Sequence, residues 1–423
     1  MLLRAWRSSI PAEPARHASG GKWDAWAALQ GQVAAAIETV EDGHVDEDLR
    51  EQLISWTLDE AGNVDPDRVD AVAWGISDAG VESFEAQWLA ELTAPEPRPF
   101  TLREGDLFPV PDPSWRPLAD HRLTARPSRM RSPDVGDLPH VRAFKPGPVD
   151  VVIDPRFDGI LNMLIDELQV VAALWPNQDF DEFALTARSE ATFTIAATDP
   201  VQQATNVDRV IDAGLASGAT VLALPELSTA RDVPPMLRDR LERFDDKVRL
   251  IVAGSCHEPA GEAWTNTCLG VISDGPDYLR HDKLVPVELR DAGVPRKEAV
   301  EAFAHPITIY AAAGVRLAIL ICRDYLDQGV GRVLDALGVN LILVPAMSDR
   351  TDGFATNAHG HVAATQAVSF VVNGPLSWHG DAVVPAAVLA QPIVQSTVVE
   401  LMPPAATPAV EARTLLVRSL TSR

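Results

Sequence analysis

Two side chains that could carry out covalent chemistry each follow an apolar run of strand length. Glu226 comes just after the run Ala219–Leu224, and Cys322 directly follows the run Val315–Ile321. Ligands in open α/β sheets bind at the carboxyl ends of the strands. We therefore expect an acid and a thiol side by side at one sheet edge, where a carboxylate can take the proton of an attacking thiol.

The setting of Cys322 suits a nucleophile. The pattern predicts a helix over Leu326–Leu337 just after it, and the N–H groups and positive dipole end of a helix favour a thiolate. Cys268 lies inside an apolar run, and Cys256 lies at the end of one with no helix after it. We therefore predict that Cys256 and Cys268 are structural.

The elements that position these residues alternate between strand and helix from about Val149 onward. The periodicity predicts amphipathic helices over Gly159–Leu174 and Val201–Ala216. Apolar runs of strand length occur at Ala191–Ala197, Ala219–Leu224, Arg249–Gly254, Thr267–Ile272, Val315–Ile321 and Asn340–Val344. Two helix-spanned pairs, 191–224 and 315–344, are typical of βαβ units, so the sequence predicts a layered α/β fold.

The first 148 residues differ from the rest of the chain in their pattern of apolar residues and prolines. Apolar spacing predicts helices between about Trp23 and Leu92, in a small module packed by tryptophans. Prolines then recur every few residues from Pro95 to Pro148, which excludes helices and central strands. We predict a helical module over 1–94, a proline-rich linker or arm over 95–148, and the α/β domain over 149–423.

An arginine group lies in the proline-rich segment, at Arg122, Arg126, Arg129 and Arg131. These side chains could bind the acidic surface of a partner. We favour pairing with the protein's own excess of carboxylates.

The composition bounds the function. A net charge of −24 argues against nucleic-acid binding, which needs a basic face. No signal peptide is recognisable, and no apolar stretch approaches the roughly 18 residues of a membrane span. The three cysteines form neither a disulfide framework nor a zinc pair, so we expect a cytoplasmic, reducing setting.

Three blocks in order carry a resemblance to a known family. The glutamate block is Leu222-Ala-Leu-Pro-Glu-Leu227. The lysine block joins Trp264-Thr-Asn-Thr267 to Asp274-Gly275 and His281-Asp282-Lys283. The cysteine block is Leu317–Asp324, followed by Leu341–Ala346. Over about residues 190–375 the chain resembles the nitrilase superfamily of amidases, carbamoylases and nitrilases, which implies an α-β-β-α sandwich.

The resemblance also implies roles. Glu226 would be the general base, Lys283 the cation and Cys322 the nucleophile. The Lys283 ammonium and the backbone N–H of Arg323 can hold the oxyanion of a tetrahedral intermediate. Glu288 matches a second glutamate found in many sites of this family, where it holds the lysine or orients the substrate. A carboxylate on the protein surface is an equally good interpretation of Glu288.

Some positions depart from the family pattern. The helix expected over Val362–Val368 should carry Arg-Ala-x-Glu-Asn, but Ala363, Gln366 and Ala367 stand there. Met347 and Ser348 follow Pro345-Ala346, where many members have an aromatic residue. Substrate identity is therefore not carried over.

Arg323, directly after the nucleophile, is a bulky cation at the floor of the expected pocket. It could bind an anionic substrate or pair with Asp324 or Asp327. A second polar group, His359-Gly-His361 with acids upstream, lacks the spacing of a known metal site, so we predict a polar loop and no metal.

The sequence therefore predicts a cofactor-free carbon–nitrogen hydrolase that forms a cysteine acyl-enzyme on an amide, carbamoyl or nitrile substrate. One alternative is transfer of the acyl group to an amine. Another is a sensor or scaffold that contacts a protein partner through the N-terminal module. The resemblance further implies a homodimer through helices that flank the sheet.

Overall fold

The computed structural model describes residues 21–37, 47–63, 65, 68, 71–72, 75, 97–103, 107–109, 141–143, 147–166, 168–173, 183–197, 200–216, 218–243, 247–261, 263–273, 278–291, 294–312, 315–365, 367–374, 377–378, 382–383, 385–391, 398–401 and 414–416. The chain divides into two compact units. One comprises 1–95, 103–112 and 127–145, and the other 96–102, 113–126 and 146–423. The arginine group of the proline-rich segment lies outside the described residues.

The first unit contains two packed helices, α2 (Gly21–Ile37) and α3 (Glu47–Trp56). Val33 and Leu53 are buried between them, and Trp56 packs against this core from a partly buried position. The other tryptophan side chains expected in this core lie outside the described residues. The unit also contains a short antiparallel pair, β2 (Leu107–Pro109) with β3 (Val141–Ala143).

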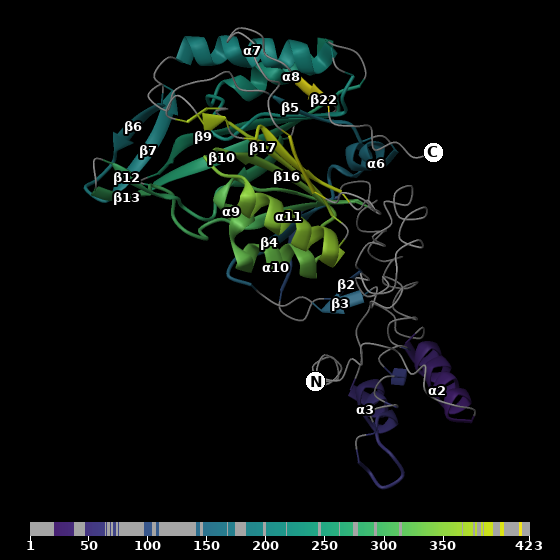
Figure 1. Ribbon diagram of the computed structural model, residues 1–423. Coiled ribbons are helices and arrows are strands. Elements are labelled where there is room, and N and C mark those ends of the chain that lie inside the picture. Colours follow the sequence, from purple (N-terminus) through teal and green to yellow (C-terminus); the bar gives the residue numbers. More distant parts are fainter. Residues whose placement is uncertain are drawn as a thin grey trace. The chain divides into compact units, whose positions relative to one another are not determined.

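Two large sheets dominate the second unit (Figure 1). The six-stranded sheet has the order β11 (Tyr278–Asp282), β10 (Ala263–Ile272), β9 (Leu250–Ala260), β8 (Val221–Ala223), β5 (Val170–Ala173) and β22 (Thr414–Leu416). The eight-stranded sheet has the order β1 (Phe100–Thr101), β4 (Val151–Asp154), β14 (Ile307–Ala311), β15 (Arg316–Ile319), β16 (Leu341–Ala346), β17 (Val368–Asn373), β20 (Ala387–Ala390) and β21 (Val398–Leu401). A two-stranded pair is formed by β18 (Ser377–Trp378) and β19 (Ala382–Val383). The predicted α/β class is confirmed.

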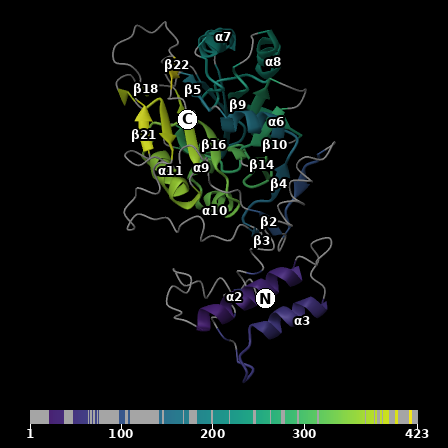
Figure 2. The same cartoon turned by 90° about the vertical axis from the view of Figure 1, so that its right-hand side faces the viewer.

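Helices lie on the outer sides of the two sheets (Figures 1 and 2). The six-stranded sheet shares a buried apolar core with α7 (Pro200–Ala216) and α8 (Val233–Arg243). The eight-stranded sheet is packed by α11 (Asp352–Thr365), which contacts α10 (Gln328–Ala336), and α6 (Asp158–Asp166) lies against β14. No helix in the described part of the chain is both long and apolar enough to cross a membrane.

The inner faces of the sheets pack closely together. A Cβ atom at Gly270, on β10, would lie 3.2 Å from the end of the Ile319 side chain, on β15. This close approach brings the strand ends of both sheets into one region.

The strand that pairs in parallel with β8 is not the predicted run at 191–197. The helix expected over Gly159–Leu174 ends at Asp166, and Val170–Ala173 forms β5, the parallel neighbour of β8. Val170 and Val171 are fully buried, and β-branched residues favour a strand inside a sheet. Residues 191–224 are therefore not a βαβ unit of one sheet.

The run at 191–197 instead belongs to a small separate sheet. Its order is β12 (Glu288–Asp291), β13 (Val294–Glu298), β7 (Thr192–Ala197) and β6 (Phe183–Ala187). Figure 1 shows it at the left end of the unit.

The second predicted βαβ unit, 315–344, is confirmed. Strands β15 and β16 are parallel neighbours, with α10 between them in the chain. The helix predicted over Leu326–Leu337 corresponds to α10, and a separate short helix, α9 (Arg323–Leu326), precedes it, with Asp327 between the two. The Asp327 carboxylate accepts hydrogen bonds from the N–H groups of Gly329 and Val330, and so caps α10.

The helix predicted over Val362–Val368 is wrong at its end. Helix α11 stops at Thr365, and Val368 already begins β17. The six residues of β17 are all buried and pair in parallel with β16, so the interior of the sheet decides their conformation. Ala363 lies in α11, Ala367 lies between the two elements, and Gln366 is outside the described residues.

One described piece of the proline-rich segment is built into the α/β unit. Strand β1 pairs antiparallel with β4 at the edge of the eight-stranded sheet, and Leu102 next to it is 6% exposed. Edge strands are where proline-rich sequence can join a sheet, because they need fewer backbone donors.

We therefore expect a chain of residues 96–423 to be more stable than one of residues 146–423. The shorter chain loses β1 and the burial of Leu102, which is worth about 1.5–3 kcal/mol for a side chain of this size. Thermal unfolding of the two fragments tests this. Equal unfolding temperatures would mean that the arm contributes nothing to the fold.

Candidate active site

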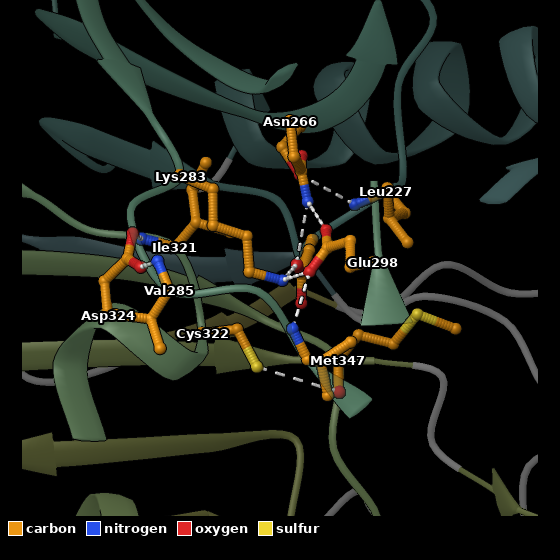
Figure 3. Close-up of polar contacts among 12 residues, drawn as sticks. Leu227, Asn266, Lys283, Val285, Glu298, Ile321, Cys322, Asp324 and Met347 are labelled. Carbon is orange, nitrogen blue, oxygen red and sulfur yellow. Dashed lines mark hydrogen bonds and ion pairs between the residues drawn. The ribbon is translucent and has the colours of Figure 1, made fainter. Parts of the chain in front are cut away.

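Cys322 lies at a sharp bend between β15 and α9. Its φ of 44° is positive, a conformation that costs a non-glycine residue energy and is often found at functional sites. Its N–H donates to the carbonyl of Pro345 at 2.9 Å, and its Sγ lies 3.9 Å from the carbonyl of Met347 (Figure 3). The side chain is 9% exposed. The bend therefore fixes the sulfur at the carboxyl end of the sheet.

The environment of this thiol differs from the expected one. Burial raises the pKa of Cys322, the nearby Glu226 carboxylate raises it further, and Lys283 only partly opposes them. The helix N-terminus expected to favour a thiolate belongs to α9, which has only four residues, and burial beside the Glu226 carboxylate favours the protonated thiol. The thiol needs a base in order to react.

Glu226 reaches the same place from the other sheet, so the prediction of a single sheet edge for both residues is wrong. It follows β8, and its N–H donates to the carbonyl of Ala346 at 3.3 Å. The carbonyls of two consecutive residues of β16, Pro345 and Ala346, thus hold the backbones of both Cys322 and Glu226. This shared strand end brings the acid and the thiol together.

The turn after Glu226 is held against β9. Leu227 has a φ of 59°, and its N–H donates to Ser255 Oγ at 3.1 Å. At Gly254, a Cβ atom would lie 2.2 Å from Ser228 Oγ and 2.4 Å from the carbonyl of Pro225. Only glycine allows this approach.

Lys283 lies between two carboxylates. Its Nζ is 2.8 Å from Glu226 Oε1 and 2.7 Å from Glu298 Oε2, and its side chain is 2% exposed. Asn266 Nδ2 donates to Glu226 Oε1 at 3.0 Å and to Glu298 Oε1 at 3.1 Å (Figure 3). Although burial lowers the pKa of Lys283, the two carboxylates raise it well above its usual value. The lysine is therefore a fixed cation.

Glu298 was missed by sequence reasoning, and Glu288 does not hold the lysine. These two residues begin and end the hairpin β12–β13, where Glu288 pairs with Lys297. Side chains alternate along a strand, so Glu298 points to the opposite side from Lys297. Accordingly Glu288 and Lys297 are exposed, whereas Glu298 is 2% exposed. The alternation of this hairpin was the signal that could have identified Glu298.

The two carboxylates are not equivalent. Glu298 accepts hydrogen bonds from Lys283, Asn266, the ring of His257 at 2.9 Å and the N–H of Val287 at 3.0 Å. Burial opposes its ionisation, but Lys283 and His257 hold the pKa of Glu298 well below its usual range.

For Glu226, burial raises the pKa and the Glu298 charge adds to this effect, against the opposing charge of Lys283. The hydrogen bonds from Lys283 and Asn266 both end on Oε1 of Glu226. Both carboxylates pair with the lysine, and the raised pKa of Glu226 makes it the one of the two that more readily takes up a proton.

Asp324 ties the lysine segment to the cysteine segment. Its Oδ1 accepts from the N–H groups of Leu284 and Val285 at 3.0 and 2.7 Å. Its Oδ2 lies 2.8 Å from His281 Nε2 and accepts from the N–H of Ile321 at 3.3 Å. Asp324 is completely buried, so this carboxylate sets the spacing between Lys283 and Cys322.

The other predicted residues lie around this centre. Arg323 is exposed, and the acids proposed as its partners are engaged elsewhere, Asp324 as above and Asp327 as the cap of α10. Met347 is partly buried and packs with Phe193, Ile195 and Leu227 in an apolar cluster. This cluster flanks the site.

Cys256, Cys268 and His361 make none of the contacts described above. Cys268 is buried in β10, and burial raises the pKa of Cys256 to about 11. The polar loop predicted around His359-Gly-His361 is wrong: these residues lie in α11, where His361 is buried with its Nδ1 2.6 Å from Asp335 Oδ1. No group of three or more metal-ligating side chains occurs among the residues described.

Comparison with known proteins was made on sequence and on structure. No protein-family model and no curated protein matches the chain. The NitN amidase from Nesterenkonia sp. AN1 is 16% identical with a TM-score of 0.40, over 59% of this chain and 92% of that chain. Nit3 from Saccharomyces cerevisiae, a member of branch 10 of the nitrilase superfamily, is 11% identical with a TM-score of 0.43, over 60% and 90%.

The chain is similar to nitrilase-superfamily structures. A further structure of the Nesterenkonia amidase, 16% identical with a TM-score of 0.41 over 60% of this chain and 91% of that one, shows covalent addition of the acetamide moiety of fluoroacetamide at that protein's active-site cysteine. Identities and TM-scores this low do not transfer an activity to this chain.

The geometry predicts that Glu298→Gln slows the alkylation of Cys322 by about tenfold or more. The reason is the loss of a charge-assisted hydrogen bond to the buried lysine. The control is Glu288→Gln, the same change at the exposed end of the same hairpin, which should stay within about twofold of the wild type. The rate of Cys322 alkylation by iodoacetamide, measured by peptide mass mapping, gives both values. Equal effects of the two substitutions would contradict the assignment of Glu298.

Proposed function

We propose that this protein is a carbon–nitrogen hydrolase that acts through an acyl-enzyme on Cys322, on a nitrilase-type α-β-β-α sandwich. The observation that carries the proposal is the convergence of a buried thiol, a buried carboxylate with a raised pKa and a fixed ammonium at the ends of strands from both sheets. A scaffold would not need such a trio, since burying three ionisable groups costs stability.

In the acylation step, Glu226 takes the proton of Cys322 as Sγ attacks the carbonyl carbon of an amide. A carbon–sulfur bond forms, and the carbonyl oxygen becomes an oxyanion. The intermediate then collapses, the carbon–nitrogen bond breaks, and Glu226 returns the proton to the leaving amine. A carboxylate with a raised pKa is suited to both transfers.

The oxyanion needs donors that are already in place. Lys283 Nζ supplies a positive charge whose position is set by two carboxylates. The backbone N–H of Arg323 is the second candidate, because the neighbouring N–H groups of Cys322 and Asp324 already donate to Pro345 and Ile321. Preorganised donors of this kind are worth about 10²–10³ in rate each.

Deacylation uses the same groups in reverse order. Water attacks the thioester while Glu226 takes its proton, the carbon–sulfur bond breaks, and the thiol regains its proton. No cofactor enters this scheme.

The proposal predicts that Cys322→Ala abolishes ammonia release from every substrate found in a panel of amides, carbamoyl compounds and nitriles. Cys256→Ala, a control at a partly exposed position of β9, should keep the wild-type rate. Ammonia release is measured by a coupled assay. Substantial turnover by Cys322→Ala would refute the assignment.

The role of Glu226 predicts a pH dependence. Because the pKa of Glu226 is raised, its carboxylate becomes protonated at a higher pH than an ordinary glutamate as the pH falls. As the pH falls, alkylation of wild-type Cys322 by iodoacetamide should therefore already slow down at a pH above about 4.3, the pKa of an ordinary glutamate.

The matched variant is Glu226→Gln, which has nearly the same shape and no proton to exchange. This substitution should slow the alkylation of Cys322 by about 10²–10⁴, and the rate should no longer fall as Glu226 would become protonated at low pH. An unchanged fall in the variant's rate at low pH would assign the titration to another group.

A further inference from the structure

The ring of His257 links the active site to the small four-stranded sheet. His257 lies on β9, and its side chain is 2% exposed. Its Nε2 lies 2.9 Å from Glu298 Oε1, and its Nδ1 lies 3.1 Å from the N atom and 3.0 Å from the O atom of Ile195, on β7. Every polar atom of this buried ring is therefore in use.

These contacts close a loop of three strands. Glu298, at the end of β13, pairs with Phe193 on β7 in a parallel ladder. Two residues further along β7, Ile195 meets the His257 ring from β9. The histidine thus fixes both the strand that carries Glu298 and the carboxylate itself.

The hydrogen-bond chemistry sets the direction of the contact with Glu298. An ionised carboxylate only accepts hydrogen bonds, so Nε2 of His257 must carry a proton and donate it. The backbone of Ile195 offers Nδ1 both a donor and an acceptor, so Nε2 keeps its proton whether the ring is neutral or charged.

We infer that His257 is a positioning residue that holds Glu298 in the orientation in which it pairs with Lys283, so that Glu226 is left to exchange protons with Cys322. The inference rests on the function proposed above. One oxygen of Glu298 accepts from His257 and Asn266, and the other accepts from Lys283 and the N–H of Val287. Without His257 the carboxylate can turn, and the ammonium can shift toward Glu226 and weaken it as a base.

The two ring nitrogens can be tested separately with two amides. The side-chain nitrogen of glutamine can occupy the place of Nε2, so His257→Gln keeps the donor to Glu298. Asparagine reaches only as far as Nδ1, so His257→Asn keeps the contact with Ile195 and loses the one with Glu298. His257→Ala loses both.

The control is His361→Ala, which removes another buried histidine bonded to a carboxylate, at Asp335 in α10. This control tests whether the loss of any buried, carboxylate-bonded histidine slows Cys322 alkylation simply by destabilising the fold.

The measurement is the rate of Cys322 alkylation by iodoacetamide in the full-length chain, by peptide mass mapping, together with the thermal unfolding temperature of each variant. We expect His257→Gln to stay within about twofold of the wild type. We expect His257→Asn and His257→Ala to be slower by about tenfold or more, as for loss of a bond to a charged group. His361→Ala should react at the wild-type rate even if its unfolding temperature falls.

Equal rates for the glutamine and asparagine variants would overturn the inference, as would rates that simply follow the unfolding temperatures. Failure of all three His257 variants to fold would overturn it too, because the residue would then be structural. Alkylation needs no turnover, so these results are independent of whether the protein hydrolyses amides. Failure of the hydrolase proposal would show instead as a lack of ammonia release by the wild type.

Discussion

The buried ammonium of Lys283 is the interaction on which the rest of the site depends. It brings one positive and two negative charges together in a place that water hardly reaches. Removing such ions from water costs several kcal/mol each, and their attraction repays this only with good geometry and further hydrogen bonds. Asn266 and His257 supply those bonds from the two long strands of the six-stranded sheet. The lysine therefore fixes where every neighbouring group can lie.

Both sheets are needed to build this arrangement. The proposed base, Glu226, follows a strand of the six-stranded sheet, and the proposed nucleophile, Cys322, follows a strand of the eight-stranded sheet. The end of β16 holds the backbones of both. The buried carboxylate of Asp324 then sets the distance between the lysine segment and the cysteine bend. Two residues with positive φ, Leu227 and Cys322, lie next to or at the reactive groups. Hydrogen bonds to Ser255 and to Pro345 hold these two strained positions in place.

The sequence alone was enough to bring Glu226, Lys283 and Cys322 into one hypothesis, because each lies at the end of an apolar run or in an ordered motif. It also predicted the α/β class and the βαβ unit around the cysteine. It failed where tertiary packing decides. Val170–Ala173 continues the apolar pattern of a helix but is buried as a strand, and Val368 leaves the helix for the sheet. Glu298 lies outside the motifs that were read from the sequence, and only the alternation along its hairpin distinguishes it from the exposed Glu288. The raised pKa of Cys322 depends on burial and on a carboxylate distant in sequence, which no local pattern reveals.

The most direct test of the account is acid-quenched mass spectrometry of the full chain during reaction with an amide substrate. The account predicts a mass increase equal to that of the acyl group, located on the peptide that contains Cys322 and reversed when the substrate is used up. Amide turnover without any adduct on Cys322, or with the adduct on Cys256 or Cys268, would contradict it.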